Sequence, residues 1–434
     1  MGEGLRHLVY DQFLSAFIRF NPYSQWYIWS KQGEGCEVMV AVQITLLLAI
    51  GYAAITIDRW QKNFPLPVFL VLVGIGLSFI PYFSTMSVSK DVIYDVFLPG
   101  LLFVSAYQYS AKALRAHKGV IGTLSTFGLI LTAVALGGFV YAFGGLFISI
   151  TFVGALLFAS ILTPTDPVSV VSILRQSTDD PAISQIVDGE SMINDGTSVV
   201  LFGVLLGMFT NGTSFHLLSF LGDFLYVSIG GAGLGILIGW LFSKALHLAP
   251  QKENQVLLSI VIAYGVFHLA EFFGFSGVLA TVSAGVMLSA ELERTANEKE
   301  YRTALNGFWE VIEPALLSLL FLLIGITSAK YLLFDHWILA IVVFVVSVFI
   351  RFLVIVGTMQ VFDGLKQRIS FSDAFLLSWS GIRGTMSVFL LLSLEAETNG
   401  NSDLIVSLGF AVVLLSLVFQ SIGIYPLSRR LTRR

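Results

Sequence analysis

The chain has 434 residues, of which 56% are hydrophobic and 12% charged, and its formal net charge is -4. Its mean hydropathy of +0.84 exceeds what the core of a soluble protein of this size requires, so the composition excludes a soluble globular fold and predicts a polytopic membrane protein. A single cysteine, Cys36, excludes a disulfide framework within the chain and a thiolate metal site, and no basic block suited to nucleic acid is present.

Residues 1–37 precede the first hydrophobic segment. They mix charged residues such as Arg6, Asp11 and Arg19 with aromatic residues and lack a continuous apolar run, so they do not form a signal peptide. We expect an amino-terminal extension that lies outside the membrane or along its interface.

Hydrophobic segments then follow one another to residue 426. Because a transmembrane helix needs roughly 20 apolar residues, we place these segments at 38–57, 66–83, 91–109, 119–142, 145–174, 182–209, 217–242, 255–272, 277–290, 308–328, 335–358, 372–394 and 404–426. The pattern predicts an all-α membrane domain over 38–426 with about thirteen transmembrane helices, and a short tail over 427–434.

Lysine and arginine are concentrated in alternate loops between these segments. One set of loops carries Arg59, Lys62, Lys112, Arg115, Lys118, Arg175, Lys244, Lys252, Arg294, Lys299, Arg302, Lys366, Arg368, Arg429, Arg430, Arg433 and Arg434. The opposite set carries only Lys90 and Lys330. The positive-inside rule therefore predicts a multi-pass protein of the cell membrane with a cytoplasmic carboxyl terminus and an external amino terminus.

Two of the segments are interrupted. Pro164 and Pro167 break segment 145–174, and Gly381-Ile382-Arg383-Gly384 breaks segment 372–394. The first and eighth segments begin at 38 and 255, 217 residues apart, and the interruptions begin at 163 and 381, 218 residues apart. This spacing predicts an inverted repeat of six helices, whose two broken helices mark a transport site near the middle of the membrane.

Four carboxylates lie close to the first interruption, in apolar segments where lipid tolerates few charges. They are Asp166, Asp188, Glu190 and Asp195. Ionisable residues within a membrane usually mark a substrate or proton pathway, so we take this cluster as the candidate site. Asp188 lies near the cytoplasmic end of its segment and is more simply a solvated funnel residue.

The stretch Thr163-Pro164-Thr165-Asp166-Pro167 offers oxygen ligands. Each proline removes a backbone donor and frees a carbonyl on the preceding turn. Together with the Thr165 hydroxyl and the Asp166 carboxylate, these carbonyls would form a hard-oxygen environment suited to a small alkali cation. A proline kink packed against neighbouring helices is the alternative.

Helical spacing divides the polar residues of segment 182–209 between two faces. Ser191 and Asp195 are four residues apart, and so are Glu190 and Asn194. We expect Ser191 and Asp195 to face an ion, with Glu190 and Asn194 bracing the site. A proton and a sodium ion would then compete for Asp195, and this competition would couple their movements.

Two arginines are candidates for structural roles. A buried carboxylate that is not the carrier needs a cationic partner, and Arg351 lies deep inside segment 335–358, where it is the candidate partner of Glu190. Arg383 lies in the second interruption, where its charge would offset the carboxyl end of the half-helix created there. Glu310 and Glu313 are interpreted as partners of the helix dipole at the start of segment 308–328, with a role in ion entry left open.

Other functions were weighed. Tyr94-Asp95 and Asp195-Gly196 weakly resemble the motifs of intramembrane aspartyl proteases, but the second lacks its preceding Gly-x-Gly. A sodium-coupled symporter on a similar fold would need more polar room beside the second interruption than Ser378, Ser380 and Thr385 provide. A channel would need a symmetric ring of carbonyls. We therefore expect a transporter and not an enzyme.

Four motifs in order resemble those of the monovalent cation/proton antiporter family, which includes the NhaP-type and animal sodium/proton exchangers. They are Thr165-Asp166-Pro167, Gly189-Glu190-Ser191, Asn194-Asp195 and Ser380-Gly381-Ile382-Arg383-Gly384. The resemblance covers about residues 38–426. It implies a fold like NhaA with two crossed broken helices, a mobile core that includes 119–209 and 335–426, and a dimerisation part that includes 38–83 and 217–290.

The same resemblance implies roles for single residues. Asp195 is the expected carrier of cation and proton. Thr165, Asp166 and Ser191 would surround it, and Asn194, Glu190 and Arg351 would stabilise the site. Family members with two adjacent aspartates are electrogenic, so Asn194 before Asp195 implies electroneutral exchange of Na+, Li+ or K+ for H+. The resemblance further implies a homodimer in the bilayer, a role in pH homeostasis and no cofactor.

Overall fold

The computed structural model describes residues 33–58, 65–84, 86, 88–144, 150–166, 181–212, 215–246, 251–295, 298–333, 335–361, 370–398 and 403–431. Throughout these ranges the regular structure is helical and contains no strand, which confirms the all-α prediction. Of the amino-terminal extension predicted over residues 1–37, residues 1–32 lie outside the described ranges.

The helices follow the hydrophobic segments closely. They are α3 (Gly33–Asp58), α4 (Leu66–Ser78), α5 (Pro81–Ser84), α6 (Leu98–Gln108), α7 (Ala111–Thr123), α8 (Leu129–Gly144), α9 (Phe152–Ile161), α11 (Pro181–Thr210), α12 (Leu217–Leu246), α13 (Lys252–Phe272), α14 (Gly277–Leu292), α15 (Glu298–Ser328), α16 (Trp337–Val361), α18 (Phe371–Trp379), α19 (Thr385–Thr398), α20 (Asp403–Leu415) and α21 (Ser421–Leu431). Three π-helical stretches continue these helices without a break, namely η1 (Val92–Phe97), η2 (Leu124–Gly128) and η4 (Ser416–Gln420), and a short 3-10 helix, η3 (Ala329–Tyr331), ends α15.

Eight helices of the described ranges are long and apolar enough to cross a membrane. Four shorter apolar helices accompany them, and two of these, α9 and α14, are extensively buried. The protein is therefore a multi-pass membrane protein, as its composition predicts. The number of thirteen transmembrane helices and the similarity to the NhaA fold remain predictions.

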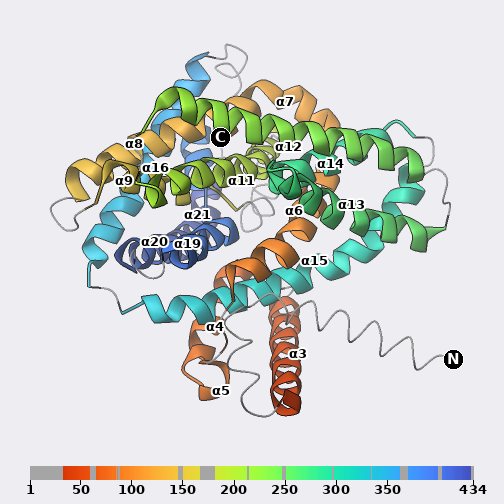
Figure 1. The fold of residues 1–434 in the computed structure, drawn as a ribbon, viewed down its shortest axis with the longest axis horizontal. Coiled ribbons are helices and arrows are strands. Elements are labelled where there is room, and N and C mark those ends of the chain that lie inside the picture. Colours follow the sequence, from red (N-terminus) through yellow and green to blue (C-terminus); the bar gives the residue numbers. More distant parts are fainter. Residues whose placement is uncertain are drawn as a thin grey trace.

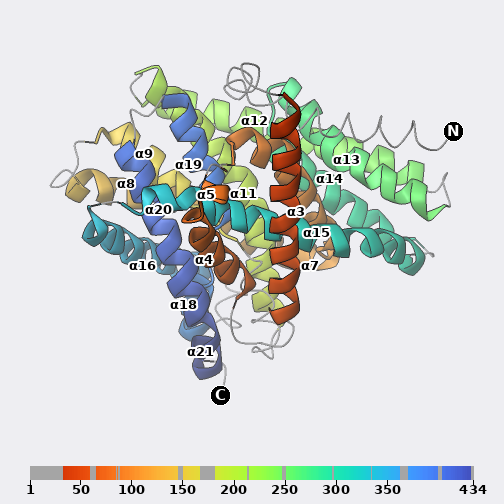
Figure 2. The same ribbon diagram turned by 90° about the horizontal axis from the view of Figure 1, so that it is seen from below.

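Helix α11 lies near the centre of the molecule, as Figures 1 and 2 show. On one side of it, α9 packs against α8, α16 packs against α18 and α20, and α19 packs against α20. On the other side, α14 packs against α6, α12 and α13, while α15 packs against α3, α4 and α13. We call the first set (α8, α9, α16, α18, α19, α20 and α21) the α9 group and the second set (α3, α4, α6, α12, α13, α14 and α15) the α14 group.

The two interrupted helices meet at their interruptions. α9 ends at Ile161, and the chain continues through an irregular stretch to Asp166, the last residue described there. Residues 380–384 separate α18 from α19. The backbone N–H of Asp166 donates a hydrogen bond of 2.7 Å to the carbonyl of Ile382, so the two irregular stretches are joined directly. Both predicted interruptions are present, although Pro167 lies outside the described residues.

Some helices extend beyond the predicted apolar segments. α7 begins at Ala111, where the Ser110 side chain accepts the Ala113 N–H at 3.3 Å, so Lys112, Arg115 and Lys118 lie on a helix and not in a loop. The reason is that an N-cap sets a helix start, whereas hydropathy marks only the apolar part, and long basic side chains reach the interface from a helix.

Three other helices also extend past the ends of the predicted segments. α3 begins at Gly33, inside the predicted extension, and α21 continues to Leu431, inside the predicted tail. α15 begins at Glu298, so Glu310 and Glu313 lie several turns inside the helix, and their interpretation as dipole partners at its start does not hold.

Close packing of α4 against α15 depends on two glycines. A Cβ atom on Gly74 would lie 2.9 Å from the Cα of Gly325, and a Cβ on Gly325 would lie 2.9 Å from the Cα of Gly74. Small residues at a helix crossing let two backbones approach, which is a common basis of association in membranes. Gly76 lies on the same helix, α4, and a Cβ atom added to it would have no atom of another element within 4 Å.

We expect Gly325→Ala to reduce the free energy of unfolding by about 1–3 kcal/mol, because the added methyl group meets backbone that cannot move aside without separating the helices. Unfolding of the purified protein in detergent, followed by tryptophan fluorescence, measures the change. Gly76→Ala is the matched control and should leave the stability unchanged or slightly higher. Equal effects of both substitutions would contradict the packing argument.

Candidate functional site

The polar residues of α11 lie on two faces, as their spacing predicts. Ser191 and Asp195 line a cavity of about 610 Å³. Glu190 and Asn194 instead border a separate small cavity of about 20 Å³, next to Arg351. One helix thus presents one carboxylate to open space and buries another against an arginine.

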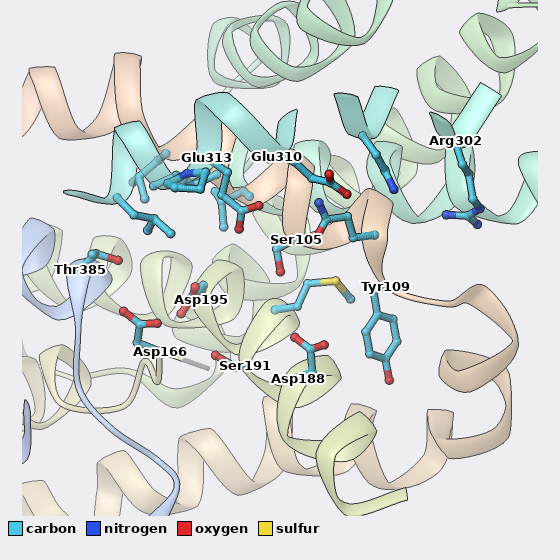
Figure 3. Close-up of a pocket in the computed structure, with 18 residues that line it drawn as sticks. Ser105, Tyr109, Asp166, Asp188, Ser191, Asp195, Arg302, Glu310, Glu313 and Thr385 are labelled. Carbon is cyan, nitrogen blue, oxygen red and sulfur yellow. The ribbon is translucent and has the colours of Figure 1, made fainter. Parts of the chain in front are cut away.

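The large cavity runs along α11, between α6 and α15, and it brings together residues that are far apart in the sequence (Figure 3). Its polar lining comprises Ser105, Gln108, Tyr109, Asp166, Asp188, Ser191, Asp195, Arg302, Asn306, Glu310, Glu313 and Thr385. Asp188 is therefore a lining residue, as predicted for a funnel. Glu310 and Glu313 also line the cavity, consistent with the role in ion entry left open above.

Asp195 lies at one end of this cavity, beside Asp166 and Ser191 (Figure 3). Its Oδ1 atom is buried and accepts no hydrogen bond from the described part of the chain. A buried carboxylate oxygen without a donor is costly in an apolar surrounding. Asp195 thus keeps a buried acceptor atom for which the described residues supply no donor.

Asp166 lies against the start of α19. A Cβ atom on Gly384 would lie 2.8 Å from the Asp166 Cγ, so only glycine permits this approach. Thr385, the first residue of α19, lines the cavity beside it. The backbone N–H groups at a helix start favour negative charge, so the position stabilises the Asp166 carboxylate.

The carbonyls near the first interruption are not free. Thr163 O accepts a hydrogen bond of 3.0 Å from Asn194 Nδ2, and the Ser191 hydroxyl donates to Thr165 O. The prediction of unused carbonyls was incomplete, because polar side chains of α11 satisfy them, as a low-dielectric surrounding requires. Thr165 is buried and does not line the cavity, and its hydroxyl accepts from Asn194 Nδ2 at 3.4 Å.

The predicted pairing of Glu190 with Arg351 is present. Arg351 Nη2 donates to Glu190 Oε2 at 2.6 Å and Nη1 donates to Oε1 at 3.1 Å, which makes a two-pronged ion pair. Both side chains are mostly buried, with 5% of Glu190 and 13% of Arg351 exposed. Asn194 Nδ2 donates a further bond of 3.3 Å to Glu190 Oε1, so the three predicted stabilising residues form one network.

Arg383 caps a helix end, but not the one predicted. Its Nε donates at 3.2 Å to the carbonyl of Leu162, the C-cap of α9. The predicted partner was the carboxyl end created by the second interruption, which is that of α18. The crossing of the two stretches explains the difference, because it places Arg383 closer to the end of the other interrupted helix.

Sequence reasoning missed several residues of the site. Gln420 and Ser416 contact the second interruption, and Gln420 stands out in the sequence only as a lone polar residue in the run Leu417-Val418-Phe419-Gln420. Ser105, Tyr109 and Asn306 line the cavity from other helices. For Ser105 and Gln420 the available signal is a polar residue within an apolar segment, which does not say where its side chain points.

The protease-like alternative finds no support in the geometry. Asp95, one half of the protease-like motif pair, lies 4.0 Å from His268 of α13 and is not a lining residue of the cavity. Among the described residues, no three His, Cys, Asp or Glu side chains are grouped as they would be to hold a metal ion.

We expect Arg351→Met to reduce the free energy of unfolding by about 3–5 kcal/mol, because it leaves the Glu190 carboxylate buried and unpaired. The double variant Glu190→Gln, Arg351→Met should recover part of this loss, since no charge then remains. Chemical unfolding in detergent measures all three proteins. Lys90→Met, which breaks a half-exposed ion pair with Glu397, is the control and should cost less than about 1 kcal/mol.

The chain is similar to known antiporters over most of its length. It is 32% identical over 349 residues to the Na(+)/H(+) antiporter NhaP of Pseudomonas aeruginosa, covering 79% of this chain and 81% of that protein. It is 30% identical over 413 residues to the Na(+)/H(+) antiporter NhaH of Halobacillus dabanensis, covering 90% of this chain and 98% of that protein.

The fold has a solved counterpart. The sodium proton antiporter MjNhaP1 from Methanocaldococcus jannaschii at pH 8 matches 92% of this chain and 99% of its own, with a TM-score of 0.73 and 19% sequence identity. Residues 44–430 match the family model described as the transmembrane sodium/hydrogen exchanger. The chain therefore belongs to the sodium/hydrogen exchanger family of membrane antiporters.

Proposed function

We propose that this protein is a secondary active antiporter that exchanges Na+, with Li+ or K+ as alternatives, for H+ across the cell membrane. The observation that carries the proposal is Asp195, whose buried Oδ1 atom has no donor within the described residues and which lies at the end of a cavity. The relatives named as Na(+)/H(+) antiporters support the choice of cation.

Asp195, Asp166 and Ser191 would bind the cation from the end of the cavity, with Thr165 behind Ser191. Carboxylate and hydroxyl oxygens are hard ligands that suit an alkali cation. Asn194, Glu190, Arg351 and Arg383 would hold these ligands in place without binding the ion. The exchange needs no cofactor, because the energy comes from the gradient of the second ion.

Coupling follows from competition for Asp195. A buried carboxylate is neutralised either by a proton or by a cation, and each must leave before the other binds. One Na+ then replaces one H+, and the exchange is electroneutral. The neighbouring Asn194 is uncharged and engaged with Glu190 and Thr163, so it adds no second titrating site.

Alternating access would move the site between the two sides. The cavity passes Asp188 near the start of α11 and Arg302 near the start of α15, and the positive-inside rule assigns these helix starts to the cytoplasm. The described conformation would thus face inward, with the carboxyl terminus inside and the amino terminus outside.

We propose that a core including 119–209 and 335–426 moves against a dimerisation part including 38–83 and 217–290. The α14 group supports this division, because α12, α13 and α14 pack extensively on one another. Exposed apolar side chains on α12, such as Leu225, Ile229 and Trp240, suit contact with lipid or with a second copy in a homodimer.

Two ion pairs would close the outer side in this conformation. Lys90, before α6, lies 2.6 Å from Glu397, and Lys330, at the end of α15, lies 3.0 Å from Glu395. Both glutamates are on α19, whereas Lys90 directly precedes η1 and α6, and Lys330 lies in η3 at the end of α15, so each pair joins α19 to a residue adjoining the α14 group. If the core moves, these pairs between the two groups break.

The first test is sodium-driven dissipation of a pH gradient in proteoliposomes. We expect the wild type to move protons when sodium is added, at a rate independent of a clamped membrane potential, and Asp195→Asn to be inactive because it cannot exchange a proton. Activity that survives in Asp195→Asn would assign the carrier role to Asp166 or Glu190. A rate that follows the potential would contradict electroneutral exchange.

The second test concerns the outer ion pairs. We expect Lys90→Gln, Lys330→Gln to lower the external sodium concentration for half-maximal exchange by about 2- to 10-fold, since each exposed pair stabilises the inward-facing state by up to about 1 kcal/mol. Right-side-out vesicles measure it, and high salt should reduce the difference.

Lys244→Gln is the matched control for the second test. It removes a pair of 3.5 Å with Glu291, but this pair joins α12 to α14 within one group. The control should leave the half-maximal concentration unchanged. A shift of the same size in the control would show that surface charge, and not the contact between groups, sets the affinity.

A further inference from the structure

We propose that Gln420 is a positioning residue that sets the cation affinity of the site by holding the second interruption in place. The inference rests on the proposed antiport function. Gln420 is fully buried in η4 and does not line the cavity, so it acts through other residues and not on the ion.

The Gln420 amide makes four hydrogen bonds around the second interruption. Its Nε2 donates to the carbonyl of Trp379 at 2.8 Å and to that of Gly381 at 3.4 Å. Its Oε1 accepts from Arg383 Nη1 at 3.3 Å and from the Ser416 hydroxyl. One side chain therefore contacts the last residue of α18 and two residues of the interruption.

The chemistry of these contacts requires an amide. Two backbone carbonyls need donors, while a guanidinium and a hydroxyl need an acceptor, and among side chains only Asn and Gln carry two N–H donors and a carbonyl acceptor on one planar group. Glutamate would keep the acceptor but lose both donors. Leucine would keep the approximate volume and lose all four bonds.

Ser416 completes the same support one turn earlier. Its Oγ accepts the backbone N–H of Arg383 at 2.9 Å, so η4 binds Arg383 through both its main chain and its side chain. η4 is a π-helical stretch, a form that recurs at functional sites because its extra residue re-aims side chains. Here it aims Ser416 and Gln420 at the interruption.

The interruption in turn places Asp166 next to Asp195. The carbonyl of Ile382 accepts the N–H of Asp166 at 2.7 Å, and Gly384 packs against the Asp166 side chain. Arg383 also donates from Nε to the carbonyl of Leu162 at the end of α9. A displacement of residues 381–384 would therefore move Asp166 relative to Asp195, although Gln420 touches neither.

Gln43 offers a matched control. It is also a buried glutamine of an apolar helix, α3, and its Nε2 donates to the carbonyl of Tyr82 at 2.6 Å. Its contact joins α3 to α5 and involves neither interruption. Gln43→Leu removes a buried amide with one such bond and Gln420→Leu removes one with four, so the control reports the effect of losing a buried amide away from the interruptions.

The experiment compares Gln420→Leu, Gln420→Glu, Ser416→Ala and Gln43→Leu in proteoliposomes with the wild type. It measures the sodium and lithium concentrations for half-maximal exchange, and the maximal rate per folded protein. We expect Gln420→Leu to raise the sodium value about 10-fold or more, as loss of a partner that orients metal ligands commonly does, and to change the ratio of the sodium to the lithium value.

Gln420→Glu and Ser416→Ala should change the sodium and lithium concentrations for half-maximal exchange by smaller factors. If Gln420→Leu does not fold, these two variants test the proposal. Gln43→Leu should leave both concentrations at their wild-type values. Wild-type concentrations in every folded Gln420 and Ser416 variant would overturn the proposal and reduce Gln420 to a structural role. Absence of sodium-driven proton movement in the wild type would instead refute the proposed function, so the two failures are distinguishable.

Discussion

The site depends on one constraint, which is that a helix interrupted within a membrane exposes backbone groups that need partners. Two interruptions meet in this protein. The backbone N–H of Asp166, in the first, donates to the carbonyl of Ile382, in the second, so each interruption supplies a hydrogen-bond partner to the other. The remaining carbonyls take donors from side chains, as Leu162 does from Arg383 and Thr163 from Asn194. The hydrogen-bonding needs of the backbone therefore bring polar side chains together around the two interruptions, and the carboxylates of the site lie among these side chains.

Near the interruptions, the structure contains a carboxylate with a fixed cationic partner and a carboxylate without one. Glu190 is neutralised by the two-pronged pair with Arg351, whereas Asp195 on the adjacent face of α11 is left without such a partner among the described residues. A permanently paired acid cannot exchange ions, because its cation is part of the protein. An acid without a fixed partner must take its counter-charge from the cavity. This separation is the physical basis of the proposed competition between sodium and proton.

Much of this arrangement is predictable from local pattern. The apolar segments locate the helices because lipid demands about 20 apolar residues per crossing, and the four-residue spacing in α11 predicts which of Ser191, Asp195, Glu190 and Asn194 share a face. The pairing of Glu190 with Arg351 is also predictable, since two opposite charges in apolar segments have few other ways to be stabilised. Helix ends were predicted less well, because caps such as Ser110 set them and not hydropathy.

The sequence by itself determined that this chain is a helical membrane protein, where its helices are broken and which acidic residues lie beside a break, because burial, proline and helical period act over a few residues. Only the tertiary structure decided that Arg383 caps α9, that Thr165 lies behind Ser191, and that Gln420 holds the second interruption. These contacts join residues up to 221 positions apart. Their geometry depends on how whole helices cross, and no local pattern carries that information.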